Sequence, residues 1–125
     1  MSTDKQATVL IVDDEFFNRL LLQDILKESS FRVVGEAAEG EEAIRLCQEL
    51  QPDIVLMDVM MPGMDGIQVT KAVLRQNPQV RVIMCSTVSQ QAQIAEALRA
   101  GAVDFIVKPI IPDKVRETLQ KVWAK

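Results

Sequence analysis

Two kinds of segment alternate along the chain. Short runs rich in apolar and β-branched residues recur at similar intervals, and they occupy residues 7–13, 31–37, 53–59, 80–86 and 102–108. All of these runs except the second are almost continuously apolar, as is typical of strands that are covered on both faces of a sheet. The pattern therefore predicts five strands, four of them buried on both sides.

The segments between and after these runs carry apolar residues at the spacing of three and four that is typical of amphipathic helices. In chain order, the five helical patterns consist of Phe17, Leu21, Ile25 and Leu26; Ala43, Ile44, Cys47 and Leu50; Ile67, Val69, Val73 and Leu74; Ile94, Ala97 and Leu98; and Val115, Leu119 and Val122. Gly101 fits the end of the fourth predicted helix, and Pro112 fits the first turn of the fifth.

Five strand–helix units of similar length predict an α/β fold in which a single five-stranded parallel sheet carries helices on both faces. The strand count matches the doubly wound, flavodoxin-like order 2-1-3-4-5, whose ligand crevice lies at the carboxyl ends of the first and third strands. No linker or low-complexity tract interrupts the pattern, so we expect residues 1–125 to form one domain.

Composition narrows the classes of function. A content of 48% hydrophobic and 26% charged residues suits a globular domain and not a disordered chain. The net charge of -4 opposes nucleic-acid binding. We expect a cytoplasmic protein without membrane insertion, because the sequence shows neither a signal pattern nor a bilayer-spanning apolar run. Cys47 and Cys85 lack metal-binding or redox spacing, so we expect reduced core residues.

The first strand ends on adjacent carboxylates in "VLIVDDE" (9–15), and the third ends on Asp58. Asp13 and Asp14 would lie on one side of the predicted crevice and Asp58 on the other. Each carboxylate alone also fits a solvated strand end or a helix cap. Three of them together would repel one another by several kcal/mol if partly desolvated, which favours a bound cation. With oxygen ligands only, the predicted cation is Mg²⁺.

Two further polar residues end strands at the same rim. Lys108 is either an ordinary solvated charge or a lysine aimed at the carboxylates, and a cis bond to Pro109 would fix its direction. Ser86 either adds its hydroxyl to this rim or caps the fourth helix. A carboxylate, a lysine, a hydroxyl and Mg²⁺ together predict a phosphoryl-transfer site. Asp58 is the predicted nucleophile because it projects alone from a central strand. The chain contains no histidine, which excludes catalysis or phosphate relay by an imidazole of its own.

The motifs "VLIVDDE", "DIVLMDVMMPGMDG", "IMCS" and "GAVDFIVKP" occur in the order and at the spacing of a known family. On these motifs the whole chain resembles the receiver domain of two-component response regulators, most of all the stand-alone chemotaxis proteins of CheY type. The resemblance implies that Asp58 accepts phosphate from a phosphohistidine on a sensor histidine kinase. It also implies that Asp14 binds Mg²⁺ directly, that Asp13 binds it largely through water, and that the backbone carbonyl of Met60 completes the protein ligands.

The same resemblance implies a conformational switch. Ser86 would shift toward a phosphoryl oxygen, Lys108 would pair with that oxygen, and Phe105, at the family's aromatic position, would move inward. The changed surface, formed by the fourth helix, fifth strand and fifth helix, would bind a target such as the flagellar motor switch. The chain would then be a signalling protein and not an enzyme, since it would catalyse only its own phosphorylation and dephosphorylation.

In this family, the residues two positions after the phosphoacceptor and two after the hydroxyl tune how readily water reaches the acyl phosphate. Here these residues are Met60 and Val88, which offer no amide or carboxylate to orient a water molecule. We therefore expect slow loss of the phosphoryl group unless a separate phosphatase supplies a polar group.

Three alternatives stay open. The chain could be the receiver of a longer DNA-binding regulator, although its ending, "LQKVWAK", resembles a complete helix and favours a stand-alone protein. It could be a phosphorelay intermediate that passes phosphate back to a histidine of another protein. A haloacid-dehalogenase-type phosphatase also phosphorylates an aspartate after an apolar strand, but it needs a second aspartate two residues later, where this chain has Met60.

Overall fold

Strands and helices alternate throughout residues 6–124, the part of the chain that this computed structural model describes. The strands are β1 (Ala7–Val12), β2 (Phe31–Ala37), β3 (Ile54–Asp58), β4 (Arg81–Ser86) and β5 (Asp104–Val107). The helices are α1 (Phe16–Lys27), α2 (Gly40–Leu50), α3 (Gly66–Gln76), α4 (Gln91–Arg99) and α5 (Pro112–Trp123), and a short 3₁₀ turn, η1 (Val88–Gln90), precedes α4. Every predicted strand begins and ends within two residues of its expected bounds.

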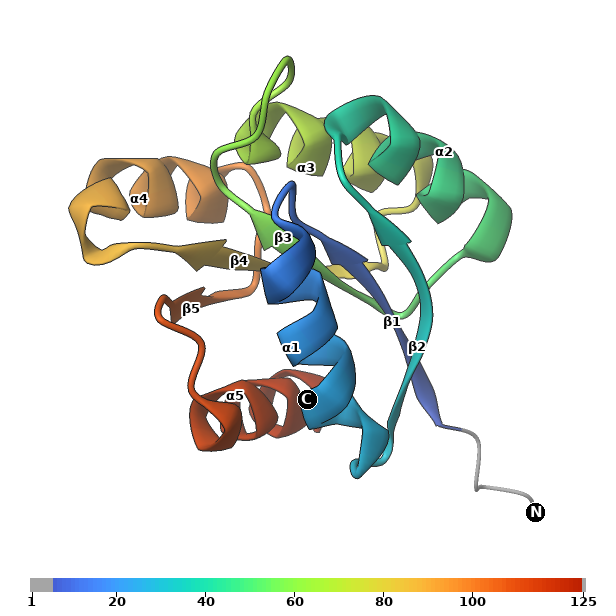
Figure 1. Ribbon diagram of the computed structural model, residues 1–125. Helices are drawn as coiled ribbons and strands as arrows, with labels where there is room; N and C mark the ends of the chain where they lie inside the picture. Colours follow the sequence, from blue (N-terminus) through green and yellow to red (C-terminus); the bar gives the residue numbers. More distant parts are fainter. Residues whose placement is uncertain (1–5, 125) are drawn as a thin grey trace.

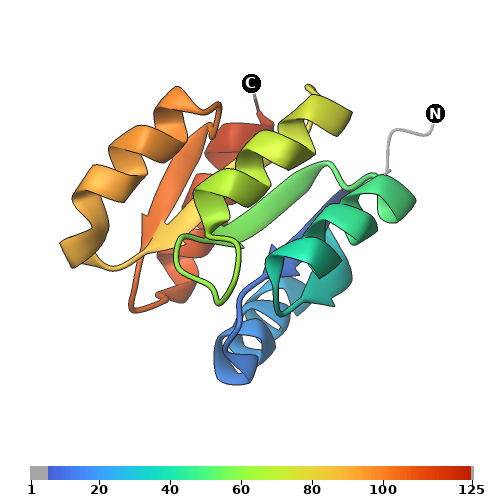
Figure 2. The ribbon, with the colours of Figure 1, turned by 90° about the horizontal axis from the view of Figure 1, so that it is seen from above.

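Neighbouring strands of the sheet are parallel, and their order is β2-β1-β3-β4-β5, which confirms the predicted topology. Helices α2, α3 and α4 cover one face of the sheet, and α1 and α5 cover the other (Figure 1). Seen from above, α2, α3 and α4 lie side by side in front of the sheet (Figure 2). Because the chain passes from β2 across β1 to β3, the strand order reverses beside β1. The crevice therefore lies at the carboxyl ends of β1 and β3.

Two apolar cores lie on the two faces of the sheet, because successive residues of a strand point to opposite sides. The strand residues in the core under α2, α3 and α4 include Leu10, Val12, Val55, Met57, Val82 and Met84. The strand residues in the core under α1 and α5 include Val9, Ile11, Leu56, Ile83, Cys85 and Ile106. Burial on both sides confirms the prediction for β1, β3 and β4, and Cys47 and Cys85 are buried free thiols as expected.

Strand β5 departs from the prediction of burial on both faces. Ile106 is buried, but its neighbours Phe105 and Val107 are exposed to 39% and 40%. Both of these side chains point to the face that carries α4. Since β5 is an edge strand, it has a neighbouring strand on only one side, and the helix layer covers it incompletely.

Three apolar positions of the helical patterns are exposed as well, contrary to the expected core-facing stripes. Phe17 is exposed to 69%. Each residue advances a helix by about 100°, so Phe17 lies about 80° around α1 from Ile25 and outside the buried stripe. Leu50 and Leu98 are the other two exposed positions. They lie in the last turns of α2 and α4, where a helix end leaves side chains less covered.

The loop from β3 to α3 passes directly over the end of β3. Gly66 donates its N–H to the carbonyl oxygen of Val59 at 2.8 Å, and a Cβ atom on Gly66 would lie 2.1 Å from the carbonyl oxygen of Asp58. Asp65 and Gln68 then form a reciprocal capping box at the start of α3. Only glycine permits this close approach, which fixes the loop that carries Met60.

We predict that Gly66→Ala lowers the free energy of unfolding by about 3 kcal/mol, because the added methyl group would overlap the carbonyl oxygen of Asp58. Gly63→Ala is the matched control in the same loop. Gly63 has a φ of +82° and no atom within 4 Å of an added Cβ, so only the left-handed conformation is penalised, by about 1 kcal/mol. Urea unfolding measures both losses, and equal losses would contradict the close-approach argument.

Candidate functional site

Three strands end at one rim of the sheet, and each brings a charged residue to it. Asp58 is the last residue of β3, Asp13 directly follows β1, and Lys108 directly follows β5. The backbone N–H of Asp13 donates to the carbonyl oxygen of Ala37 at 3.0 Å, and that of Lys108 donates to the carbonyl oxygen of Ser86 at 2.6 Å. Because parallel strands end at the same edge, the topology itself gathers these residues.

The carboxylates of Asp13, Asp14 and Asp58 form an acidic cluster in which one oxygen of each residue lies within 4.8 Å of the others. Asp13 and Asp58 are only 2% and 5% exposed, whereas Asp14 is exposed. The structure thus brings together the three carboxylates that the sequence placed on opposite sides of the crevice.

The ammonium group of Lys108 lies between the two buried carboxylates. Its Nζ atom is 3.3 Å from Oδ2 of Asp13 and 3.2 Å from Oδ1 of Asp58. The bond from Lys108 to Pro109 is cis, as the sequence allowed. Lys108 is therefore aimed at the acidic cluster and is not an ordinary solvated charge.

Burial and charge shift the ionisation of this group of residues. Burial, reinforced by the neighbouring charge of Asp13, raises the pKa of the Asp58 carboxyl to about 6. The Lys108 ammonium and a hydrogen bond from the backbone N–H of Met60 act in the opposite direction and reduce the rise. Burial alone would lower the pKa of Lys108, but the carboxylates of Asp58 and Asp13 outweigh it and raise that pKa.

The donor set of the acidic cluster fits a hard divalent cation. Three carboxylates and one ammonium leave two net negative charges when all four groups are ionised (-3 + 1 = -2). The cluster offers only oxygen donors, which Mg²⁺ prefers, and the exposure of Asp14 leaves room for the water ligands that Mg²⁺ retains.

The other predicted site residues lie around this cluster. Ser86 ends β4 and is buried. It does not cap the following helical segment, because the N-cap of η1 is Thr87, whose N–H donates to Oε1 of Gln90 at 2.8 Å. Phe105 lies exposed on β5, three residues before Lys108, and the side chain of Met60 is exposed on the loop beside Asp58.

Sequence reasoning missed a polar network behind Asp13. Arg19 of α1 donates to the backbone carbonyl oxygen of Asp13 and forms an ion pair with Glu36 of β2. Asn18 donates to Oδ2 of Asp13 at 3.3 Å. The available signal was Glu36 itself, a charged residue near the end of a strand that was expected to lie beside the strand carrying Asp13.

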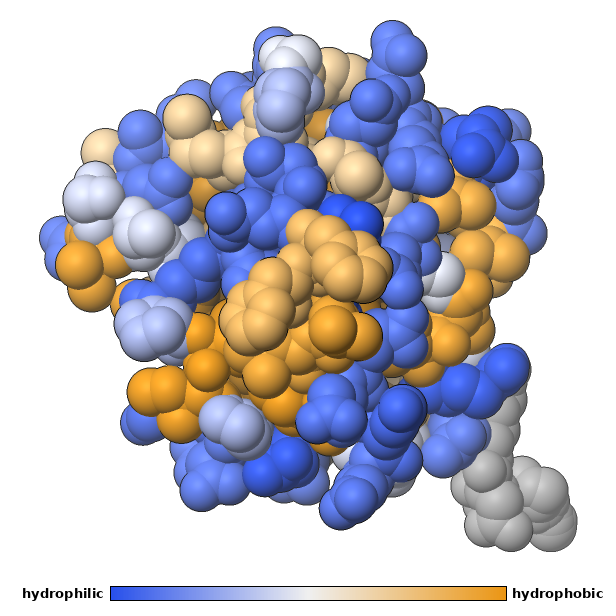
Figure 3. All heavy atoms as spheres, in the orientation of Figure 1, coloured by the Kyte–Doolittle hydropathy of each residue, from blue (hydrophilic) through white to orange (hydrophobic). Residues whose placement is uncertain are grey.

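An apolar patch lies on the surface of α1, close to the acidic cluster in the sequence and in space. The patch consists of Phe16, Phe17 and Leu20, which are all more than half exposed. These side chains form part of the apolar area at the centre of the face shown in Figure 3. The rim of the site is therefore apolar on the side of α1 and charged at the strand ends.

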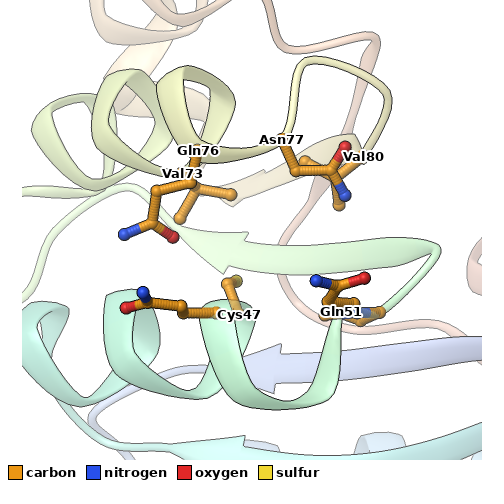
Figure 4. A pocket seen from close by; sticks show the side chains of 8 residues that line it. Cys47, Gln51, Val73, Gln76, Asn77 and Val80 are labelled. Carbon is orange, nitrogen blue, oxygen red and sulfur yellow. The ribbon is translucent and has the colours of Figure 1, made fainter.

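A separate cavity of about 380 Å³ lies between α2 and α3 and contains none of the cluster residues. Side chains of Gln51, Gln76 and Asn77 line it together with Cys47 (Figure 4). Burial raises the pKa of the Cys47 thiol to about 11, which keeps this thiol protonated and unreactive at neutral pH. The reactive groups of the described residues are thus found at the acidic cluster and not in this cavity.

We predict that Asp58→Asn raises the free energy of unfolding of the metal-free protein by about 2 kcal/mol at pH 7.5. The folded-state pKa of about 6 lies above the usual value, so the unfolded chain ionises first as pH rises, and the folded state loses stability between about pH 4 and 6. At pH 4 the gain should almost disappear, because the carboxyl group is then protonated in the folded state.

Urea unfolding in EDTA at both pH values measures this effect. Asp113→Asn is the control, because Asp113 is an exposed partner of Arg116 and should change stability little at either pH. A gain for Asp58→Asn that is equal at both pH values would contradict the assigned cause.

Comparison with known proteins agrees with this geometry. Residues 9–120 match the family described as response regulator receiver domain. A chemotaxis protein CheY from Thermotoga maritima is 49% identical over 114 residues, which cover 91% of this chain and 95% of the relative. A protein-glutamate methylesterase/protein-glutamine glutaminase from the same organism is 44% identical over 110 residues, which cover 86% of this chain but only 32% of the relative.

Solved structures give the same result. A chain in the crystal structure of the CheX–CheY–BeF₃–Mg²⁺ complex from Borrelia burgdorferi superposes with a TM-score of 0.90 at 36% identity, and the match covers 95% of this chain and 90% of that one. The chain therefore belongs to the response regulator receiver domain family, and it is homologous to CheY, a phosphorylation-activated switch of chemotaxis two-component systems.

Proposed function

We propose that Asp58 is the phosphoacceptor of this switch and takes its phosphoryl group from a phosphohistidine on a sensor histidine kinase. The observation that carries the proposal is the convergence of the Lys108 ammonium and the buried Asp13 carboxylate on Asp58. Asp58 ends a central strand at the rim of the sheet, where its carboxylate would attack a phosphorus atom presented from outside.

In the reaction, a carboxylate oxygen of Asp58 forms a bond to phosphorus while the bond from phosphorus to the imidazole nitrogen breaks. Only the ionised carboxylate is nucleophilic, and a pKa of about 6 leaves Asp58 mostly ionised at neutral pH. Asp13, Asp14 and Asp58 would hold Mg²⁺ together with the backbone carbonyl of Met60. When bound, Mg²⁺ would offset the negative charge of the transferring phosphoryl oxygens.

Lys108 is the residue that would change partner. A phosphoryl group on Asp58 brings new anionic oxygens to the place where Lys108 now pairs with the carboxylate, so the ammonium would turn to them. Ser86 would donate its hydroxyl to another phosphoryl oxygen. Ser86 pairs with Val107 in the register of β4 and β5, so its shift would reach Phe105 through the adjacent strand and draw that ring inward.

The proposed target surface consists of α4, β5 and α5. It presents exposed apolar side chains at Leu98, Phe105 and Val107. A target such as the flagellar motor switch would bind this surface after phosphorylation, and a solved complex of a similar CheY with a second protein, CheX, supports the expectation of protein partners. The chain would act as a signalling protein that catalyses only its own phosphorylation and dephosphorylation.

Within residues 6–124, no helix has the length and apolar character needed to cross a bilayer. A cytoplasmic location and the absence of nucleic-acid binding stay predictions from the sequence.

Two alternative roles within the receiver family stay open for this chain. The chain could be the receiver of a longer regulator, as the similar segment of the Thermotoga methylesterase is, or a phosphorelay intermediate. Binding of the phosphorylated chain to flagellar-switch proteins and to histidine-phosphotransfer proteins separates a motor output from a relay. The haloacid-dehalogenase alternative has no support, because the chain belongs to the receiver family and carries Met60 at the position of the second aspartate.

We predict that acetyl phosphate adds one phosphoryl group to the purified chain in the presence of Mg²⁺ and far less in EDTA. Intact-mass spectrometry measures the gain, which Asp58→Asn should abolish and Asp113→Asn should leave unchanged. A phosphoryl group that survives Asp58→Asn would overturn the assignment of the site.

We further predict slow intrinsic loss of this phosphoryl group, because the exposed side chains of Met60 and Val88 cannot orient an attacking water molecule. Met60→Asn should accelerate the loss on the order of tenfold by supplying a polar group beside Asp58. Val103→Asn, which replaces an exposed apolar residue elsewhere, is the control. Fast decay of the unmodified chain with no partner present would refute the prediction.

A further inference from the structure

Arg19 of α1 connects the backbone of Asp13, a residue of the acidic cluster, to Glu36 of β2. Its Nη1 atom donates to the backbone carbonyl oxygen of Asp13 at 2.7 Å, and its Nε atom donates to Oε1 of Glu36 at 2.9 Å. The side chain of Arg19 is only 15% exposed, and its guanidinium lies 5.7 Å from the centre of the Phe16 ring. The planar guanidinium thus bridges α1, the end of β1 and β2 in one fixed orientation.

Glu36 fixes the orientation of the Arg19 side chain and neutralises its charge. The carboxylate of Glu36 accepts hydrogen bonds from Arg19 and also from the side-chain amide of Gln23. An unpaired guanidinium beside the acidic cluster would repel a second cation. Paired with Glu36, Arg19 can orient the backbone of Asp13 without adding net positive charge behind the cluster.

The position of the Asp13 backbone decides where two carboxylates of the cluster lie. Asp13 and Asp14 are consecutive, so a movement of the peptide group between them displaces both side chains. Oδ1 of Asp13 also accepts the N–H of Glu15 at 2.9 Å, a bond that depends on the same stretch of backbone. Arg19 is the side chain that holds the carbonyl oxygen of that peptide group.

We infer that Arg19 is a positioning residue for divalent-cation binding, acting through the backbone of Asp13 and anchored by Glu36. This inference rests on the proposed function, because it takes the acidic cluster to be the Mg²⁺ site. Arg19 touches neither the cation nor the phosphoryl group in this role. Its loss should weaken cation binding without removing a ligand.

The test compares Mg²⁺ binding by isothermal titration calorimetry at pH 7.5. Arg19→Met, which keeps the apolar stem but removes both donated hydrogen bonds, should raise the Kd for Mg²⁺ about tenfold. Arg19→Lys should give an intermediate Kd, because one ammonium cannot reproduce the two-pronged geometry. Arg45→Met is the matched control: it removes an exposed helix arginine paired with Glu49, and the Kd should stay within about twofold.

A second readout separates positioning from a general structural role. With acetyl phosphate as donor, Arg19→Met should raise the Mg²⁺ concentration for half-maximal phosphorylation while the rate at saturating Mg²⁺ stays close to that of the unmodified chain. Glu36→Met should have a similar effect, and the double variant should be no worse than Arg19→Met, since the two residues act in series. Additive losses in the double variant would overturn the series arrangement.

The outcomes distinguish this inference from the proposed function. If Arg19→Met and Arg19→Lys fold cooperatively but bind Mg²⁺ as tightly as the unmodified chain, the role of Arg19 is refuted and Asp58 phosphorylation is unaffected. If the unmodified chain binds Mg²⁺ but acetyl phosphate never modifies Asp58, the proposed function fails while the assignment of Arg19 to cation binding stands.

Discussion

The carboxylates of Asp13 and Asp58 are buried side by side at the end of the sheet, with the ammonium group of Lys108 between them. Removing such ions from water costs several kcal/mol each, and Lys108 offsets only part of that cost, as the raised pKa of Asp58 shows. The burial of apolar side chains in the two cores therefore has to offset the cost of burying these carboxylates, which opposes folding. Because negative charge at this rim exceeds positive charge, the rim favours binding of a divalent cation. Without a cation, the repulsion between the carboxylates stays uncompensated.

The residues of this site come from two kinds of strand: central strands that are buried on both faces, and the edge strand β5, which is less well covered. Both buried carboxylates are carried by central strands with apolar cores on each side, so their positions are strongly fixed. Lys108 follows β5, an edge strand with exposed residues, and its backbone pairs with Ser86 of β4. A change of charge at Asp58 would therefore act on this poorly covered strand through Lys108, which pairs with both carboxylates. Such a strand is suited to carry a rearrangement to the surface.

The strand order and the convergence of Asp13, Asp14 and Asp58 could be predicted from the sequence, because both follow from where each apolar run ends. Residue exposure was harder to predict. The apolar run around Phe105 reads like a buried strand, and only the strand order reveals that it lies at an edge. The link from Arg19 to Glu36 was missed because it joins a helix to a strand, and the charge of Glu36 near the end of its strand does not reveal which helix residue pairs with it.

The unequal roles proposed for the two adjacent carboxylates have a physical basis. Asp13 is buried, and its oxygens already accept hydrogen bonds from Glu15, Asn18 and Lys108. Asp14 is exposed, and within residues 6–124 no hydrogen bond to its carboxylate is present. A cation can therefore bind Asp14 directly without displacing a partner, whereas direct binding to Asp13 would compete with Lys108. This difference supports direct contact through Asp14 and contact through water at Asp13, the division that the family resemblance implied.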